Sequence, residues 1–171
     1  MKFLLNRSPI KVILKNNSLR GEAMDLNKYK IPQISVFIEN KKGRFYNTTR
    51  VLKEAGVNIR AMSLADTMDF GILRFVVDKP EKAYEALMDN HFIVKMNDVI
   101  AVAIKDECGG LAELLKTISD LDLNIEYMYT FVNNMDNKAV MLFKFEDIDE
   151  AIEKLLKAGA ELLDEDYFKR I

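Results

Sequence analysis

The amino-acid sequence predicts an α+β protein built of two ferredoxin-like βαββαβ sandwiches packed within one chain. Two segments, "IENKKGRFYNTTRVLKEAGVNI" from Ile38 and "IKDECGGLAELLKTISDLDLNI" from Ile104, align without a gap. Around both segments, strand and helix signals follow in the same order. A repeated supersecondary unit predicts two domains of one fold, and right-handed crossovers place both helices of such a unit on one face of its sheet.

The first unit is expected over residues 31–97, after an N-terminal extension at 1–30. Apolar residues at spacings of three and four from Phe45 predict an amphipathic helix, and Gly56 is placed where a helix would end. Pro80 suits the first turn of a second helix. In chain order, we expect a strand at 34–39, a helix ending before Gly56, strands at 57–66 and 70–78 around a hairpin turn at 67–69, a helix from Pro80 and a strand at 91–96.

The second unit, residues 98–171, repeats this order after a linker of almost no length at 97–99. Leucines and isoleucines between Leu111 and Leu121 give a helical stripe. Asp147 and Glu150 predict a capping box at the start of the last helix. The expected elements are a strand at 99–105, a helix over the stripe, strands at 124–132 and 139–146 around the turn at 133–138, a helix after Asp147 and a strand at 160–168.

The N-terminal extension differs in charge from the rest of the chain. Residues 1–30 carry seven Lys and Arg against Glu22 and Asp25, which leaves 18 basic against 25 acidic residues afterwards. Two interpretations stay open. Met24 is the native start, since "LRGEAM" could be encoded by a ribosome-binding site ahead of a start codon, or the extension is a basic arm that pairs as an extra strand.

Composition excludes several classes of function. The acidic folded part should repel nucleic acid and anionic membranes, so neither is an expected partner. Cys108 is the only cysteine, which excludes an intramolecular disulfide and favours the reducing cytoplasm. One Cys and one His are too few for a metal site of the usual kind. No convergent acid, base or nucleophile is visible. We therefore expect no cofactor, no metal and no catalysis.

The repeat retains its polar features in the loop after the first strand and at the start of the second strand. Glycines at positions such as Gly43 and Gly109 allow close approach of a backbone, and the helix that follows offers N–H groups to a carboxylate. Asn40 and Asn58 supply both donors and acceptors. We expect these segments to be neighbours and to bind a free α-amino acid. Alternatively, the glycines serve the turn and the asparagines cap the loop and the helix.

These residues resemble those of the ACT domain, a regulatory module of amino-acid metabolism, and in particular its serine-sensing version in phosphoglycerate dehydrogenase. The family pattern is a strand, E-N-x-x-G and a helix that ends in G-V-N-I, which this chain has at Glu39–Gly43 and Gly56–Ile59. The resemblance covers residues 33–170 as two tandem domains. It implies a side-by-side eight-stranded sheet with ligands at the interface between domains.

By position, the resemblance implies one site with Asn40, Gly43 and Asn124, and another with Asp106, Gly109 and Asn58. The chain departs from the serine sensor at Ile38, where that family has a histidine, and at Asp106. We expect tighter binding at the Asn40 site, and ligand specificity from Arg60, Met62, Tyr127 and Tyr129. The candidate ligand-binding residues are Asn40, Lys41, Lys42, Gly43, Arg44, Asn58, Asp106, Glu107, Cys108, Gly109, Gly110, Leu111, Asn124 and Ile125.

The sequence therefore predicts a non-catalytic amino-acid sensor or regulatory protein whose ligand lies between two ACT domains. The expected partners are a free amino acid, a second copy of the chain and an enzyme of amino-acid metabolism. The alternative is a structural module that helps to assemble an enzyme complex and binds no ligand.

Overall fold

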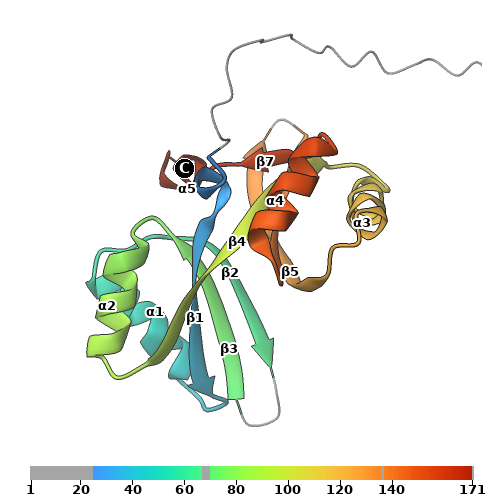
Figure 1. The fold of residues 1–171 in the computed structure, drawn as a ribbon. Helices are drawn as coiled ribbons and strands as arrows, with labels where there is room; N and C mark the ends of the chain where they lie inside the picture. Colours follow the sequence, from blue (N-terminus) through green and yellow to red (C-terminus); the bar gives the residue numbers. More distant parts are fainter. Residues whose placement is uncertain (1–24, 67–69, 136, 171) are drawn as a thin grey trace, which may run out of the picture.

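The computed structural model describes residues 25–66, 70–135 and 137–170, and it contains two βαββαβ-like units (Figure 1). The N-terminal extension before residue 25 and the predicted turn at 67–69 lie outside the described residues. The first unit comprises η1 (Asn27–Tyr29), β1 (Ile31–Glu39), α1 (Arg44–Glu54), β2 (Ile59–Asp66), β3 (Phe70–Val77), α2 (Pro80–Asp89) and the first half of β4 (Ile93–Lys105). The second comprises the rest of β4, α3 (Gly110–Asp120), β5 (Ile125–Met135), β6 (Lys138–Phe145), α4 (Ile148–Lys157), β7 (Glu161–Leu163) and α5 (Glu165–Arg170).

Strand β4 belongs to both units. The sequence predicts two strands separated by a linker at 97–99, but the structure has one strand of 13 residues there. Its first half pairs antiparallel with β1, and its second half pairs with β6 and β7. Polar Asn97 and Asp98 stay in the strand because their positions pair with Gln33 and Pro32 of β1. Figure 1 shows β4 running from one domain into the other.

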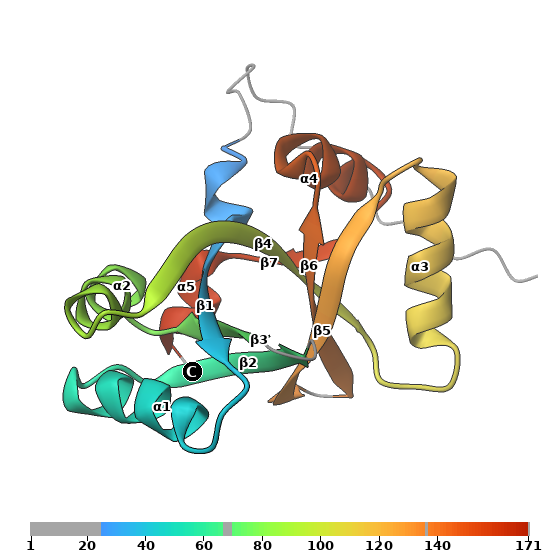
Figure 2. The ribbon, with the colours of Figure 1, turned by 90° about the horizontal axis from the view of Figure 1, so that it is seen from below.

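Each domain has its own hydrophobic core on the helix-covered face of its sheet (Figure 2). In the first domain, α1 and α2 cover strands that point fully buried Ile34, Leu73 and Phe75 toward them. In the second, Leu114 and Ile118 of α3 and Ile152 of α4 pack against buried β4 and β6 side chains. Because successive side chains of a strand point to opposite faces of the sheet, the other side chains of each strand lie on the face that carries no helix.

The half of the sheet in each domain packs against the other half through its helix-free face. The strand order is β2-β3-β1-β4-β6-β5, with β7 beside β4, and it gives seven strands in one curled sheet. The side-by-side eight-stranded sheet implied by the resemblance is therefore wrong within this chain. A third core fills the interface, and its buried members are Ile31, Ala61, Val76, Val99, Ala101, Phe131, Val140, Leu142 and Phe168.

The C-terminal segment is mostly helical, whereas the sequence predicts a strand over 160–168. Only β7 forms, and α5 follows. Asp164 accepts a hydrogen bond from the Tyr167 backbone N–H at 2.9 Å, as a residue that starts a helix does. Phe168 thereby reaches the interdomain core, where its ring centroid lies 5.6 Å from that of Phe131.

Other local predictions are confirmed. Gly56 follows α1 with a φ of 65°, and Pro80 is the first residue of α2. The Asp147 carboxylate accepts from the Glu150 backbone N–H at 2.9 Å, which is one half of the predicted capping box. The Glu150 carboxylate instead pairs with Lys154 at 2.7 Å.

Candidate functional site

The two glycine loops share a left-handed glycine immediately before a helix. Gly43 and Gly109 precede α1 and α3 with φ angles of 85° and 98°, in the left-handed region that favours glycine. Gly110 follows with no room for a side chain, because an added Cβ would lie 2.3 Å from the Lys105 carbonyl oxygen. The repeat in sequence thus corresponds to a repeat in conformation.

Neither α1 nor α3 has a side-chain cap among the described residues, whereas Asp147 caps α4. The first N–H groups of the two helices, those of Arg44 and Gly110, donate to the carbonyl oxygens of Lys41 and Glu107 at 3.2 and 3.0 Å. The later N–H groups of the first turn have no partner within a helix, and the helix dipole favours negative charge there. Both glycine loops are exposed. Each domain therefore has one exposed helix start at which a carboxylate could bind.

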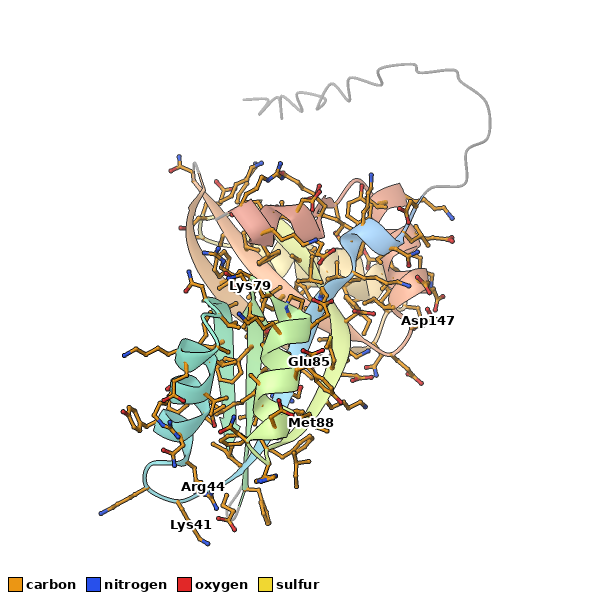
Figure 3. The ribbon with its side chains drawn as sticks, turned by 90° about the vertical axis from the view of Figure 1, so that its left-hand side faces the viewer. Lys41, Arg44, Lys79, Glu85, Met88 and Asp147 are labelled. Atoms are coloured by element: carbon orange, nitrogen blue, oxygen red, sulfur yellow. The ribbon has the colours of Figure 1, made fainter. Side chains whose placement is uncertain are left out.

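The two loops differ in charge. In the first, Glu39 accepts from Arg44 at 2.7 Å and pairs with Lys41 at 3.2 Å. The hydrogen bond from Arg44 and, to a smaller extent, the contact with Lys41 lower the pKa of the Glu39 carboxyl group. Lys42 adds a further exposed cation, and Figure 3 shows Lys41 and Arg44 together at one tip of the molecule.

The second glycine loop is more acidic. It has Asp106 and Glu107 against Lys105, whose Nζ lies 3.7 Å from Glu107. Like its neighbours, Cys108 is exposed. The charge of this loop therefore favours an ammonium group more than the charge of the first loop does.

The strand register separates the asparagines within each domain. β1 and β2 both run antiparallel to β3, so they run in the same direction. Gly71 of β3 pairs with Ile38 on one side and with Asp66, the end of β2, on the other. Asn58 precedes the start of β2 and so lies at the opposite end of the sheet from Asn40. The expectation that these two segments are neighbours is wrong, because a crossover helix of the length of α1 carries the chain back along the sheet.

The pairs implied across domains are not joined within one chain either. Asn124 lies in a hollow of about 390 Å³ with acidic residues of its own domain, among them Asp147 and Glu150. Figure 3 shows Asp147 far from Arg44, which begins α1 after the first glycine loop. Asn58 lies in a hollow of about 330 Å³ whose lining comes only from α1, the turn after it and the start of β2.

Four other residues predicted to bind the ligand pack against hydrophobic cores. Leu111 and Ile125 pack against the core of the second domain, so they support the loop and the strand behind it. Tyr127 and Tyr129 point into the interdomain interface. In the part of the chain that the structure describes, no group of three or more His, Cys, Asp and Glu side chains could hold a metal ion, and no described helix is long and apolar enough to span a bilayer.

A polar network that the sequence did not suggest lies between the domains. Fully buried Gln33 donates from Nε2 to the Tyr127 hydroxyl at 2.8 Å and to Ser35 Oγ at 3.3 Å. It accepts at Oε1 from the Tyr129 hydroxyl at 2.9 Å. Asn97 Nδ2 donates to Tyr127 at 3.2 Å. The available signal was the polar pair Gln33 and Ser35 at alternate positions of an otherwise apolar strand.

This network predicts a pH effect at Tyr129. Burial raises the pKa of the Tyr129 phenol well above its usual range, and Tyr127 raises it further, against the effect of Arg74. A raised folded-state pKa contributes stability that is complete below the ordinary tyrosine pKa of about 10 and is lost as the pH rises above it. We expect Tyr129→Phe to be less stable than the parent near pH 8, and that difference to shrink toward pH 11. Urea unfolding at several pH values measures it, and a difference that is constant with pH would contradict the assignment.

Comparisons with known proteins agree with this architecture. The family model described as an ACT domain pair matches residues 29–171. A Bacteroides thetaiotaomicron protein of known crystal structure is 39% identical, with a TM-score of 0.79, and the match covers 85% of this chain and 99% of that one. An ACT domain pair is a regulatory architecture, and this chain belongs to the ACT domain pair family.

Two further solved structures share the fold. The regulatory subunit of aspartate kinase from Thermus flavus is 16% identical, with a TM-score of 0.54, and the match covers 75% of this chain and 92% of that one. The ligand-free regulatory subunit from Thermus thermophilus is 18% identical, with a TM-score of 0.54 and coverage of 78% and 95%. A search of curated protein sequences found no match.

Proposed function

We propose that this ACT domain pair is a non-catalytic cytoplasmic sensor that binds a free amino acid and regulates an enzyme of amino-acid metabolism. The observation that carries the proposal is the conformation built twice, a left-handed glycine followed by an uncapped helix. The ligand carboxylate would accept hydrogen bonds from N–H groups of the first turn of α1 or α3 that follow Arg44 or Gly110. Asn40 or Asp106 would receive its ammonium group.

A second copy of the chain would complete each site. β2 and β5 are the outer strands of the described sheet order. Antiparallel pairing of β2 with β5 of another copy would bring Asn124 of that copy to the end of β2, at the same end of the sheet as Asn40. The same pairing would bring Asp106 of that copy toward Asn58. A homodimer therefore restores both sets of residues that one chain keeps apart, and a chain that stays monomeric with bound ligand would contradict this arrangement.

The experiment that tests the function is a thermal-shift screen of the full chain against the twenty amino acids. A ligand that binds only the folded state raises its stability by RT ln(1 + [L]/Kd), about 2.7 kcal/mol at a hundredfold excess over Kd. We expect stabilisation by one amino acid or one chemical group of them. If none stabilises the protein at concentrations far above Kd values of regulatory sites, the chain is a structural assembly module.

Two variants compare the glycine loops once a ligand is identified. We expect Asn40→Ala to weaken binding about tenfold or more, the equivalent of about 1.4 kcal/mol, and Asp106→Ala to weaken it less, because the cationic first loop suits a carboxylate better. Calorimetric titration measures both, with Asn90→Ala as a matched control on an exposed helix end. Equal losses from Asn40→Ala and Asp106→Ala would refute the difference between the sites.

A further inference from the structure

A pocket of about 290 Å³ is lined by residues of both domains and by none of the residues of the two glycine loops. Its volume is close to the lower end of the ~300–1,000 Å³ range of small-molecule sites. Both domains contribute to it through the helix-free faces of their sheets. Its lining residues are Ser35, Phe37, Ile72, Arg74, Lys95 and Asn97 of the first domain and Glu126, Tyr127 and Lys144 of the second.

The register explains why polar and apolar groups share this pocket. On the helix-free face of the first sheet, Arg74, Ser35 and Lys95 lie in one row across β3, β1 and β4. The next row, toward the end of β1, contains Ile72 and Phe37. On the opposite side of the Ser35 row, toward the start of β1, side chains of β5 and β6 cover the sheet and form the interdomain core. The pocket forms where this cover ends.

The pocket is strongly cationic. Arg74, Lys95 and Lys144 supply three positive charges, and Glu126 supplies one negative charge. Among the described residues, none of these four groups takes part in an ion pair. Lys144 Nζ donates to the Phe145 carbonyl oxygen at 2.8 Å, which leaves its charge without a carboxylate.

Arg74 is held in place without being neutralised. Its guanidinium carbon lies 4.0 Å from the centroid of the Tyr127 ring, a cation–π contact that fixes the plane of the group. Tyr127 is fixed in turn by its hydrogen bonds from Gln33 and Asn97. The Arg74 Nε atom is buried and has no hydrogen-bond partner among the described residues. Such a buried donor costs free energy unless an acceptor is supplied.

We propose that this pocket binds a small dicarboxylic acid, and among such acids an acidic α-amino acid such as aspartate or glutamate. The planar guanidinium of Arg74 suits one carboxylate, and Lys95 and Lys144 suit the other. Glu126 matches the ammonium group that distinguishes an amino acid from a plain diacid. Phe37 and Ile72 accept the short methylene chain. The site shares no residue with the glycine loops, so it does not depend on the function proposed for them.

Binding here would act on the arrangement of the two domains. Arg74 and Lys95 belong to the first sheet, and Glu126 and Lys144 to the second. A ligand that contacts both sets favours the observed packing by as much free energy as it loses when the sheets separate. Binding of an anionic metabolite in this pocket would therefore favour the observed packing of the two domains.

Calorimetric titration of the full chain tests the site. The probes are aspartate, glutamate, succinate, asparagine and inorganic phosphate. We expect saturable binding of the dicarboxylates, tightest for an acidic amino acid, and binding at least about tenfold weaker for asparagine and phosphate. No binding of any dicarboxylate, or equal binding of phosphate, would overturn the proposal.

Variants assign the binding to this pocket. Arg74→Gln and Lys95→Met should each weaken the affinity for the tightest dicarboxylate, Arg74→Gln by about tenfold or more. Lys95 is exposed, so its substitution leaves the core intact and keeps the test valid if Arg74→Gln folds poorly. Lys82→Met, on the exposed face of α2, is the matched charge control and should bind as the parent does. Binding that survives both pocket variants, or that Asn40→Ala removes, would place the ligand elsewhere.

Discussion

Phe75→Ala is expected to lower the free energy of unfolding by about 3–5 kcal/mol, the usual cost of deleting a buried aromatic side chain. Phe75 of β3 is fully buried and packs in the helix-covered core of the first domain. β3 pairs with both β1 and β2, so the surrounding side chains have little freedom to close the cavity. Urea unfolding followed by circular dichroism measures the change.

Phe70→Ala is the matched control on the same strand. Its side chain is 59% exposed, so the same substitution should cost at most about 1 kcal/mol. Similar losses from the two variants would contradict the assignment of β3 faces.

The second large effect is expected at the interdomain core. Phe168 of α5 is 2% exposed and contacts the Phe131 and Tyr167 rings. Phe168→Ala should cost about 3–5 kcal/mol. Since this core joins both sheets and β4 runs through both domains, we expect the variant to unfold in one transition at a lower urea concentration.

Lys169→Ala tests the same helix without the core contact. Lys169 is exposed and pairs with Glu165, a surface contact worth about 0–1 kcal/mol. A Phe168→Ala loss as small as that of Lys169→Ala would mean that α5 does not dock on the interface. Two separate transitions in the parent protein would contradict the shared core.

The features of the fold that depend on local sequence were predictable. Hydrophobic spacing located α1 to α4, and residues such as Gly56, Pro80 and Asp147 marked their ends. The gapless alignment of two segments predicted the repeat, because a supersecondary unit that occurs twice leaves the same pattern twice. The sequence also placed Gly43 and Gly109 in the loops before α1 and α3, and the structure adds their left-handed conformation.

Features that depend on long-range pairing were not predictable. Asn97 and Asp98 are weak strand formers, and only their pairing with β1 keeps β4 continuous. The 160–168 segment ends in a helix because the helix lets Phe168 pack against Phe131 in the interdomain core. The separation of Asn40 from Asn58 follows from strand direction, and periodicity alone does not report it. The cationic pocket combines residues from five strands, none of which forms a local motif.

The packing of the two domains determines which contacts a bound ligand would affect. Face-to-face contact buries the centre of each helix-free face, and β2 and β5, the two ends of the strand order, contact each other within the chain. The glycine loops lie at the ends of β1 and β4, outside this contact. In the homodimer proposed above, a ligand at a loop would act on contacts between copies, whereas a ligand in the interdomain pocket would act on contacts within one copy.

A crystal structure of the full chain, grown with the amino acid that stabilises it most, tests the central claim that the glycine loops bind an amino acid. The account predicts that the ligand carboxylate contacts N–H groups of the first turn of α1, after Arg44, with Asn40 within hydrogen-bond distance of the ligand. A structure in which the protein's own atoms fill both loops, while the stabilising amino acid is bound somewhere else, would contradict it.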